Sequence, residues 1–413
     1  MATENKKYIP ALRFPEFQND REWKIVLLKD FTERIKSKVG NALLRPISIS
    51  AGIGFVDQKN KFGRDISGNQ YSNYIVLKKG EFAYNKGNSI KYPQGCVYQL
   101  KEFEIVACPN VFVCFRIINN SVCPDFMSAY FASNYHGKQL QQYITSGVRS
   151  NGLLNISAET FLGIKTPLPS LSEQKKIADC LSSLENYINA TKRKLELLKE
   201  HKKGLMQRLF PAKGKTTPEL RFPEFQNNGE WNYEHGDILY DSIANKKHKS
   251  DLPILAITQE NGAIPRDEIN YRVIVEDKSI EGYKVVEIGD FIISLRSFQG
   301  GIEYSRYKGL CSPAYIVLRK RHSKIYDDFY RHYFKSFQYI KELNRNLEGI
   351  RDGKMVSYKQ FADIKLPNPC YEEQCKIAKV LSSIDDVIQI HIEKISALEL
   401  HKNGLMQQLF PKL

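Results

Sequence analysis

One long stretch of this chain occurs twice and constrains the fold more than any other feature. Residues 170–211 align without a gap with residues 370–411, at an offset of 200 residues. Within each copy, positions spaced alternately by four and three residues are apolar at eight of ten places. Such a seven-residue period keeps one stripe of a helix facing a partner helix, so each copy is expected to form one strand of a coiled coil.

The apolar stripe defines the expected interface between the two helices, which a two-fold repeat should pack antiparallel. Its members are Ile177, Leu181, Leu184, Ile188, Leu195, Leu198 and Leu205 in the first copy, and Ile377, Leu381, Ile384, Ile388, Ile395, Leu398 and Leu405 in the second. Polar residues interrupt both copies at the same places, Thr191 and Lys202 matching His391 and Lys402. Either these residues fix the register of the helices, or the lysines extend along the helix to solvent, which is the commoner arrangement.

The ends of both helices are also marked in the sequence. Ser170 and Glu173 have the spacing of a capping box, and Cys370 replaces the serine in the second copy. A proline follows each stretch and disfavours helix at the residue before it. Continuous helices are therefore predicted over residues 170–210 and 372–410.

The repeat extends beyond the helices. The motif LRFPEF stands at residues 12–17 and 220–225, and each copy precedes a tryptophan at the same distance, Trp23 and Trp231. A two-fold internal repeat predicts a pseudo-dimer within one chain. We therefore divide the chain into a first variable domain (1–169), a first helix (170–211), a linker with a second variable domain (212–369) and a second helix (370–413).

The variable domains are rich in β-branched and aromatic residues, with frequent Gly and Asn turns. This composition predicts an α+β fold with a curved sheet in each domain. Between the matched frames, the residues of the two domains differ almost completely. One scaffold that carries two different surfaces is what two different binding specificities would require.

Composition limits the class of partner. The chain has 413 residues and a formal net charge of +15, so an anionic polymer is the first partner to consider. The eight cysteines include no CxxC pair, which predicts reduced thiols in a cytoplasmic protein. The start of the sequence is polar, and no apolar run approaches the roughly 20 residues of a membrane span, so we expect neither signal peptide nor membrane helix.

Motifs of common catalytic sites are missing from the sequence. There is no GxxxxGK[ST] phosphate loop and no GxSxG nucleophile motif. Gly52 and Gly54 begin a GxGxxG pattern, but Asp57 stands at its third glycine. His201 and His401 repeat with the helices and are expected on the helix surface. We therefore expect no catalytic residue and no metal site in this chain.

Basic and polar residues in the turns of the variable domains are the candidates for contacts with DNA. They are Lys36, Lys38, Arg45, Lys59, Lys61, Arg64, Asn85, Lys86, Asn88, Lys91 and Arg149 in the first domain, and Lys246, Lys247, Lys249, Arg266, Arg296, Ser297, Gln299, Arg306, Lys308 and Arg351 in the second. Lysines near strand ends suit contacts with phosphates, which position a protein without reading sequence. Arginine, asparagine and glutamine can pair with guanine or adenine edges in the major groove. For any single residue, a role as ordinary solvated surface remains open.

The repeated frame resembles the specificity subunit of type I restriction–modification systems. The resemblance rests on LRFPEF with its tryptophan, EQxKIA with LSS, and GLMQxLFP, each present twice, and it covers nearly the whole chain. The family pattern transfers to Glu173, Gln174, Ile177 and Ala178, and to Glu373, Gln374, Ile377 and Ala378. The base-reading residues do not transfer, because these regions vary within the family.

The resemblance implies two target recognition domains that each read one half of a split DNA sequence, held apart by an antiparallel coiled coil. It implies two methyltransferase subunits docked on the chain, with nuclease–translocase subunits joining them, in the bacterial cytoplasm. S-adenosylmethionine is then expected on the methyltransferase, and ATP and Mg²⁺ on the nuclease–translocase, with no cofactor on this chain.

Two other classes of function stay open at this point. A coiled-coil scaffold for protein partners would bind DNA without regard to sequence. A self-contained nuclease or methyltransferase would need its own cofactor site, and binding of S-adenosylmethionine by the isolated chain would favour it.

Overall fold

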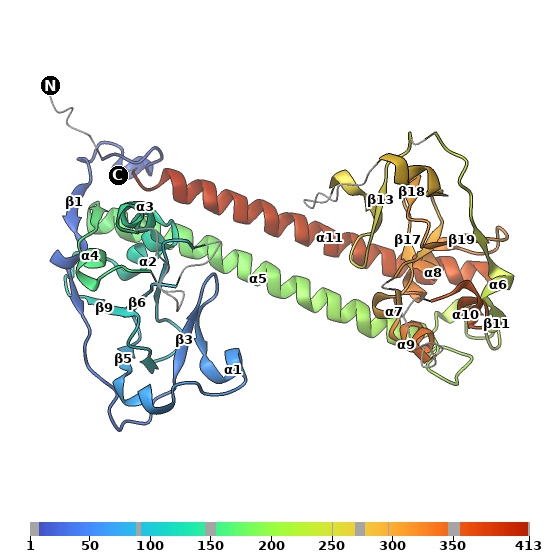
Figure 1. Ribbon diagram of the computed structural model, residues 1–413, viewed down its shortest axis with the longest axis horizontal. Coiled ribbons are helices and arrows are strands. Elements are labelled where there is room, and N and C mark those ends of the chain that lie inside the picture. The colour runs from blue at the N-terminus through green and yellow to red at the C-terminus, as the bar shows by residue number, and fades with distance from the viewer. Residues whose placement is uncertain are drawn as a thin grey trace. The chain divides into compact units, whose positions relative to one another are not determined.

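In the computed structural model, the chain divides into two compact units, each of which contains one variable domain and parts of both long helices (Figure 1). The first unit comprises Met1–Thr191 and Lys394–Leu413, and the second comprises Lys192–Glu393. The structure describes residues 8–87, 92–144, 154–249, 251–268, 277–295, 297–345 and 356–411.

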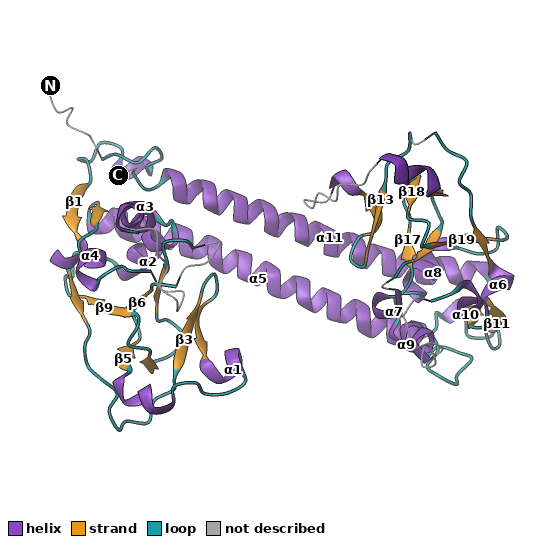
Figure 2. Cartoon of the chain, viewed as in Figure 1, coloured by secondary structure: helices purple, strands orange, loops and turns teal. Residues whose placement is uncertain are grey.

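The variable domain of the first unit is built from short antiparallel strands and short helices (Figure 2). Its strands are β1 (Lys24–Leu27), β2 (Thr32–Arg34), β3 (Ile47–Ser50), β4 (Gly54–Asp57), β5 (Ile75–Lys78), β6 (Phe82–Asn85), β7 (Cys96–Gln99), β8 (Ile105–Cys108), β9 (Val113–Ile117) and β10 (Lys165–Leu168). Its helices are α1 (Gln58–Phe62), α2 (Pro124–Ala132), α3 (Tyr135–Leu140) and α4 (Ala158–Leu162). The strands form a four-stranded sheet in the order β2-β9-β6-β7 and the pairs β1-β10, β3-β4 and β5-β8.

The second variable domain repeats this topology strand for strand. Its strands are β11 (Asn232–His235), β12 (Tyr240–Ile243), β13 (Leu255–Thr258), β14 (Gly262–Pro265), β15 (Lys284–Val286), β16 (Phe291–Ile293), β17 (Glu303–Tyr304), β18 (Gly309–Cys311), β19 (Ile316–Lys320) and β20 (Lys365–Asn368). Its helices are α6 (Gly236–Leu239), α7 (Ser297–Gly300), α8 (Asp327–Tyr333), α9 (Phe337–Arg345) and α10 (Tyr358–Ala362). The sheet order β12-β19-β16-β17 and the pairs β11-β20, β13-β14 and β15-β18 match the first domain. The α+β class and the internal repeat are therefore confirmed.

The two long helices are continuous and antiparallel, as predicted. They are α5 (Leu171–Leu209) and α11 (Tyr371–Gln408). In the first unit, Glu185 pairs with Lys402, and in the second, Lys202 pairs with Asp385. A higher number on one helix therefore meets a lower number on the other, which defines the antiparallel direction.

Burial along both helices follows the predicted spacing of four and three. Ile177, Leu181, Ile188, Leu195, Ile377, Leu381 and Ile395 are buried, and Leu184, Leu198, Leu205, Ile384, Ile388, Leu398 and Leu405 are half-buried. His201 and His401 are exposed on the helix surface. A stripe that is covered at every predicted position is what a helix seam requires.

The two polar interruptions of the stripe have different roles. Lys202 Nζ lies 2.5 Å from Asp385 Oδ1, and Lys402 pairs with Glu185, so both lysines bind a carboxylate of the other helix. The commoner arrangement, a lysine that reaches only solvent, is therefore not the one observed. Thr191 and His391 instead contact the carbonyl oxygen four residues earlier on their own helices, each at 2.8 Å. The lysine pairs favour one register of the helices, because a shifted register would leave half-buried charges unpaired.

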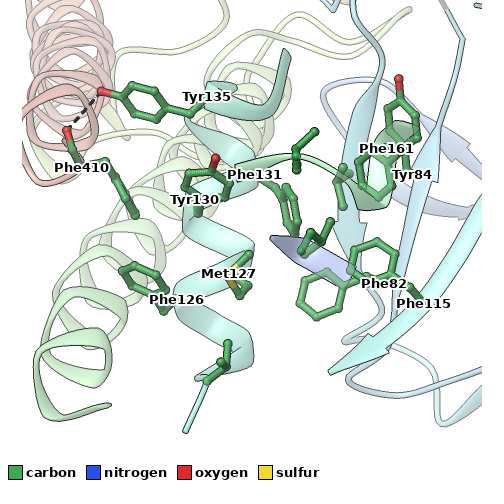
Figure 3. Packing of buried hydrophobic residues seen from close by; sticks show 14 of the residues in the cluster. Phe82, Tyr84, Phe115, Phe126, Met127, Tyr130, Phe131, Tyr135, Phe161 and Phe410 are labelled. Atoms are coloured by element: carbon green, nitrogen blue, oxygen red, sulfur yellow. Dashed lines mark hydrogen bonds between the residues drawn. The ribbon is translucent and has the colours of Figure 1, made fainter. Parts of the chain in front are cut away.

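A phenylalanine just beyond each long helix fills the core of a variable domain. Phe410 lies between Trp23 and Phe126 at ring-centroid distances of 6.2 and 5.4 Å, and Figure 3 shows it beside Tyr130 and Tyr135. In the second unit, Phe210 takes this place, 5.5 Å from Phe329 and 5.4 Å from Tyr333. The repeated LFP motif therefore fastens the end of α11 to the first variable domain and the end of α5 to the second.

The first domain contains one fully buried histidine, which gives its stability a dependence on pH. His136 is 1% exposed and packs against Tyr84 and Phe131, and burial lowers the pKa of this side chain to about 3. Below the usual histidine pKa of about 6.5, the unfolded chain binds a proton that the folded chain excludes. The free energy of unfolding should therefore fall as pH drops from about 6.5 towards 3, by about 1.4 kcal/mol per pH unit.

We expect His136→Leu to flatten the pH dependence of stability by that amount between pH 6.5 and 5.5. Urea unfolding of the full chain at pH 7.0 and 5.5 measures the difference. His201→Leu, at an exposed position on α5, is the matched control and should leave the pH dependence unchanged. An unchanged slope in His136→Leu would contradict the assignment.

Candidate nucleic-acid interface

Each variable domain is fixed to its helix by one buried carboxylate. Glu173 Oε1 and Oε2 accept hydrogen bonds from Arg13 Nε and Nη2 at 2.8 and 2.7 Å, and Oε1 also accepts from Trp23 Nε1 at 3.3 Å. The pair is almost sealed from water, with 7% of the Arg13 side chain and 1% of the Glu173 side chain exposed. A two-pronged arginine–carboxylate contact fixes direction as well as distance.

The second unit repeats this contact with equivalent residues. Arg221 Nε and Nη2 donate to Glu373 Oε1 and Oε2, each at 2.8 Å, and Trp231 Nε1 donates to Oε1 at 3.1 Å. The spacing of Ser170 and Glu173 predicted a capping box. This prediction is wrong for the carboxylate of Glu173, which binds Arg13 instead. Only the serine side of that cap is present, as a hydrogen bond of 3.4 Å from Glu173 N to Ser170 Oγ. The buried arginine accounts for the difference, because it requires the carboxylate.

The glutamine that follows each of these glutamates ties the domain to the helix a second time. Gln174 accepts a hydrogen bond from Cys123 N at 2.8 Å and donates to Ser121 O and Pro169 O at 3.1 and 3.0 Å. Gln374 accepts from Tyr326 N at 2.9 Å and donates to the carbonyl oxygen of the proline before α11, also at 2.9 Å. The repeated EQ motif thus sets the orientation of each variable domain on its own helix start.

In the first domain, two candidate residues from different connections converge on one carbonyl oxygen. Lys61 Nζ from α1 and Asn85 Nδ2 from the end of β6 both reach Ile49 O in the β3-β4 hairpin, at 3.3 and 3.5 Å. Tyr98 Oη on β7 accepts a hydrogen bond from Gly52 N at the hairpin tip, at 2.7 Å. The hairpin, α1 and the end of β6 therefore form one continuous surface.

The second domain brings the equivalent connections together. Lys335 Nζ, in the turn between α8 and α9, lies 3.3 Å from Gln259 O at the β13-β14 hairpin tip and 3.0 Å from Gly300 O in α7. It also pairs with Glu303 Oε1 on β17 at 2.5 Å. The hairpin tip and the segment after β16 are thus held side by side in both domains, by different side chains.

Most of the residues predicted to contact DNA lie on the surface of these connections. Exposed are Lys36, Lys38, Arg45, Lys59, Lys61, Arg64, Lys246, Lys247, Lys249, Gln299, Arg306 and Lys308. Half-buried are Asn85, Lys86 and Arg266. Asn88, Lys91, Arg149, Arg296 and Arg351 lie outside the described residues.

One candidate is placed where it cannot meet a base in this geometry. Ser297 is 1% exposed, and its hydroxyl oxygen accepts a hydrogen bond from Ser294 N at 2.8 Å. Lys86 is also engaged within the domain, since its Nζ lies 3.4 Å from Ile156 O. Ser297 thus stabilises its own loop, whereas Lys86 joins the end of β6 to the segment before α4.

The candidates of the two domains fall in equivalent connections. Lys36, Lys38 and Arg45 lie between β2 and β3, and the lysines 246, 247 and 249 lie between β12 and β13. The segment after the hairpin also contains candidates in both domains: Lys59 and Lys61 of α1 in the first, and Arg266 in the second. The charge balance differs, because residues 36–64 contain six basic residues and one acidic residue, whereas residues 244–268 contain four of each. The equivalent segments of the two domains therefore differ in net charge, +5 in the first and 0 in the second.

Among the described residues, no group of three or more His, Cys, Asp or Glu side chains could hold a metal ion. In the same part of the chain, no helix is long and apolar enough to cross a membrane. All eight cysteines are free thiols; Cys96, Cys108, Cys114 and Cys311 are buried and Cys370 is exposed.

Comparison with known proteins accounts for this arrangement. The family model "Type I restriction modification DNA specificity domain" matches residues 21–200 and 208–400. The chain belongs to the type I restriction–modification specificity subunit family. A specificity subunit recognises the DNA target sequence of its system and is itself non-catalytic.

Individual specificity subunits resemble this chain over most of their length. A Methanocaldococcus jannaschii protein named as the MjaX type I restriction enzyme specificity subunit is 26% identical over 416 residues, covering 94% of this chain and 92% of its own. The MjaVIII specificity subunit of the same organism is 28% identical over 299 residues, covering 67% and 68% of the two chains. The crystal structure of the S subunit from M. genitalium shares the fold, with a TM-score of 0.58, 16% identity and coverage of 98% and 99%.

Sequence reasoning missed the residues that hold the specificity domains in place. Arg13 and Arg221 belong to the repeated LRFPEF motif, so an arginine that recurs at the same place in both copies was the available signal. Tyr98, Glu303 and Lys335 carry no such signal, because the two domains use different residue types for the same contact.

Proposed function

We propose that the two variable domains, residues 1–169 and 212–369, each read one half of a bipartite DNA sequence. The observation that carries this proposal is the match between the domains. Both have the same strand pairing, and both place exposed basic or amide side chains in the same connections. The residues in those connections differ between the domains, so the two half-sites should be unrelated in sequence.

The division of labour within each domain follows from residue type. The exposed lysines of the β2-β3 and β12-β13 connections bind phosphates, which fix the position of the domain without selecting bases. The hairpin tips, the end of β6 and Gln299 in α7 supply amide and hydroxyl groups that can pair with base edges in the major groove.

The paired helices set the distance between the half-sites and dock two methyltransferase subunits. Apolar side chains exposed on both helices support the docking role: Tyr187, Leu197, Val387, Ile390 and Leu400. S-adenosylmethionine belongs to the methyltransferase, and ATP with Mg²⁺ to the nuclease–translocase that joins the complex. This chain contributes recognition alone and works on DNA in the bacterial cytoplasm.

Mapping of methylated bases tests the proposal. The full chain is expressed with its methyltransferase partner in a host free of other methylation systems, and the genome is sequenced by a method that detects modified bases. The proposal requires one methylated motif with two fixed halves separated by a spacer of constant length. A single continuous motif, or methylation that ignores sequence, would overturn it.

Lys59 on α1 allows a test of the phosphate contacts. Lys59→Ala should weaken binding to all duplexes alike and reduce the slope of log affinity against log salt concentration by about 1, since one fewer counterion is released. Binding of the complex to specific and unrelated duplexes at several salt concentrations measures this slope. Lys101→Ala, whose lysine pairs with Asp125 outside these connections, should leave it unchanged, and equal effects of both changes would refute the assignment.

A further inference from the structure

The ammonium group of Lys335 joins the β13-β14 hairpin tip to other segments of the second domain. Lys335 Nζ has three contacts: Gln259 O in the hairpin at 3.3 Å, Gly300 O in α7 at 3.0 Å, and Glu303 Oε1 on β17 at 2.5 Å. An ammonium has three hydrogens to donate, so each donor has a partner. Lys335 thereby joins the hairpin tip to α7 and β17, which follow one another in the sequence.

The ion pair at this junction is largely withdrawn from water. The side chain of Glu303 is 2% exposed and that of Lys335 is 28% exposed. Burial raises the pKa of Glu303 and lowers the pKa of Lys335, so burial works against both charges. A buried ion pair is weak evidence for a role in stability, because apolar residues of similar volume often serve as well. Unlike an apolar side chain, the ammonium group donates hydrogen bonds to two loop carbonyl oxygens, those of Gln259 and Gly300.

The hairpin packs closely against α7 and β17 at two glycines. A Cβ atom on Gly300 would lie 2.7 Å from the side chain of Gln259. A Cβ atom on Gly262, where φ is +71°, would lie 2.7 Å from Tyr304 O. The hairpin therefore packs against α7 and β17 without room for another side chain.

The first domain fastens the equivalent hairpin from the equivalent strand position. Tyr98 on β7 pairs with the residue after Phe82, and Glu303 on β17 pairs with the residue after Phe291. Tyr98 Oη accepts a hydrogen bond from Gly52 N at the β3-β4 tip, at 2.7 Å. At this matched position, Tyr98 contacts its hairpin tip directly, whereas Glu303 acts on its hairpin through Lys335.

We propose that the Lys335–Glu303 pair in the second domain and Tyr98 in the first are specificity-positioning residues, which place the hairpin tips for base recognition. This inference rests on the proposed function, in which each domain reads one half-site. Paired hydrogen bonds to base edges depend on the placement of the donors and acceptors, and functional groups must be held within about 0.5 Å of their working geometry. The fastening residues need not touch DNA themselves.

The test uses the full chain in complex with its methyltransferase partner and a library of duplexes with both half-sites randomised. The double change Lys335→Met with Glu303→Leu removes both charges together and leaves neither unpaired. It should relax at least one position of the second half-site about tenfold, as for loss of one base contact, and leave the first half-site unchanged. Tyr98→Phe, which removes only the hydroxyl oxygen, should relax the first half-site and spare the second.

Two controls separate positioning from general damage to the fold. Lys335→Arg retains a cation that can donate to the same carbonyls and should keep most of the discrimination, whereas Lys341→Met, at an exposed position of α9, should have no effect. If the unaltered complex selects no two-part sequence, the proposed function itself fails. If it selects one, and the double variant and Tyr98→Phe select the same sequence with equal discrimination, the positioning role is wrong while the proposed function stands.

Discussion

Replacing Glu173 with alanine should lower the free energy of unfolding of the first unit by about 3–5 kcal/mol, the usual cost of removing one partner of a buried ion pair. The change leaves the guanidinium of Arg13 nearly buried without its counter-charge, and it removes the hydrogen-bond acceptor of Trp23 Nε1. The leader segment should then detach from the start of α5. Chemical unfolding of the full chain, followed by tryptophan fluorescence, measures both effects.

The repeat supplies a matched experiment and a control for this prediction. Glu373→Ala removes the same contact from Arg221 and Trp231 and should destabilise the second unit to a similar degree. Glu16 forms an ion pair with Lys176 on the surface of the same leader segment, where half of each side chain is exposed. Glu16→Ala should therefore have little effect, and a loss equal to that of Glu173→Ala would contradict the importance of burial.

Placing an aspartate in the seam of both helices should abolish the paired-helix structure. Leu181 is 4% exposed and Leu381 is fully buried, and both belong to clusters that also contain core residues of the variable domains. A carboxylate at each position would cost several kcal/mol unless it is neutralised. We expect the double variant Leu181→Asp with Leu381→Asp to lose its cooperative thermal transition and to fail to co-purify with the methyltransferase subunits.

The same substitution at exposed positions of the same helices is the control. Leu197 is 56% exposed and Leu400 is 74% exposed, so aspartate at both should leave the thermal transition of the isolated chain intact. If the seam variant melts at the same temperature as this control, Leu181 and Leu381 do not support the helix pair.

The helices could be predicted from the sequence because their apolar residues recur at short spacings, and the repeat could be predicted because the same motifs occur twice. A seam buries one residue every three or four positions, so the periodicity of Leu181, Leu184 and Ile188 is visible without any knowledge of distant contacts. The β-branched and aromatic composition of the variable domains likewise predicted their α+β class, but the order in which the strands pair was not predicted.

Contacts between distant segments were not accessible in the same way. Glu173 was interpreted from its neighbour Ser170, whereas its actual partner, Arg13, stands 160 residues away. For Lys202, register and extension to solvent both stayed open, because nothing near it in the sequence indicates a carboxylate on the opposite helix. For Ser297, residue type suggested contact with a base, but burial depends on how α7 packs, which no local pattern records.

The exchange of one variable region tests the central claim most directly. Residues 24–165 are replaced by the equivalent region of another specificity subunit, and the methylated motif is mapped in a host that also supplies the methyltransferase. The account predicts that one half of the motif changes to that of the donor, while the other half and the spacer length stay as they were. A change in both halves together would contradict it, because the two variable domains would then form one composite reading surface.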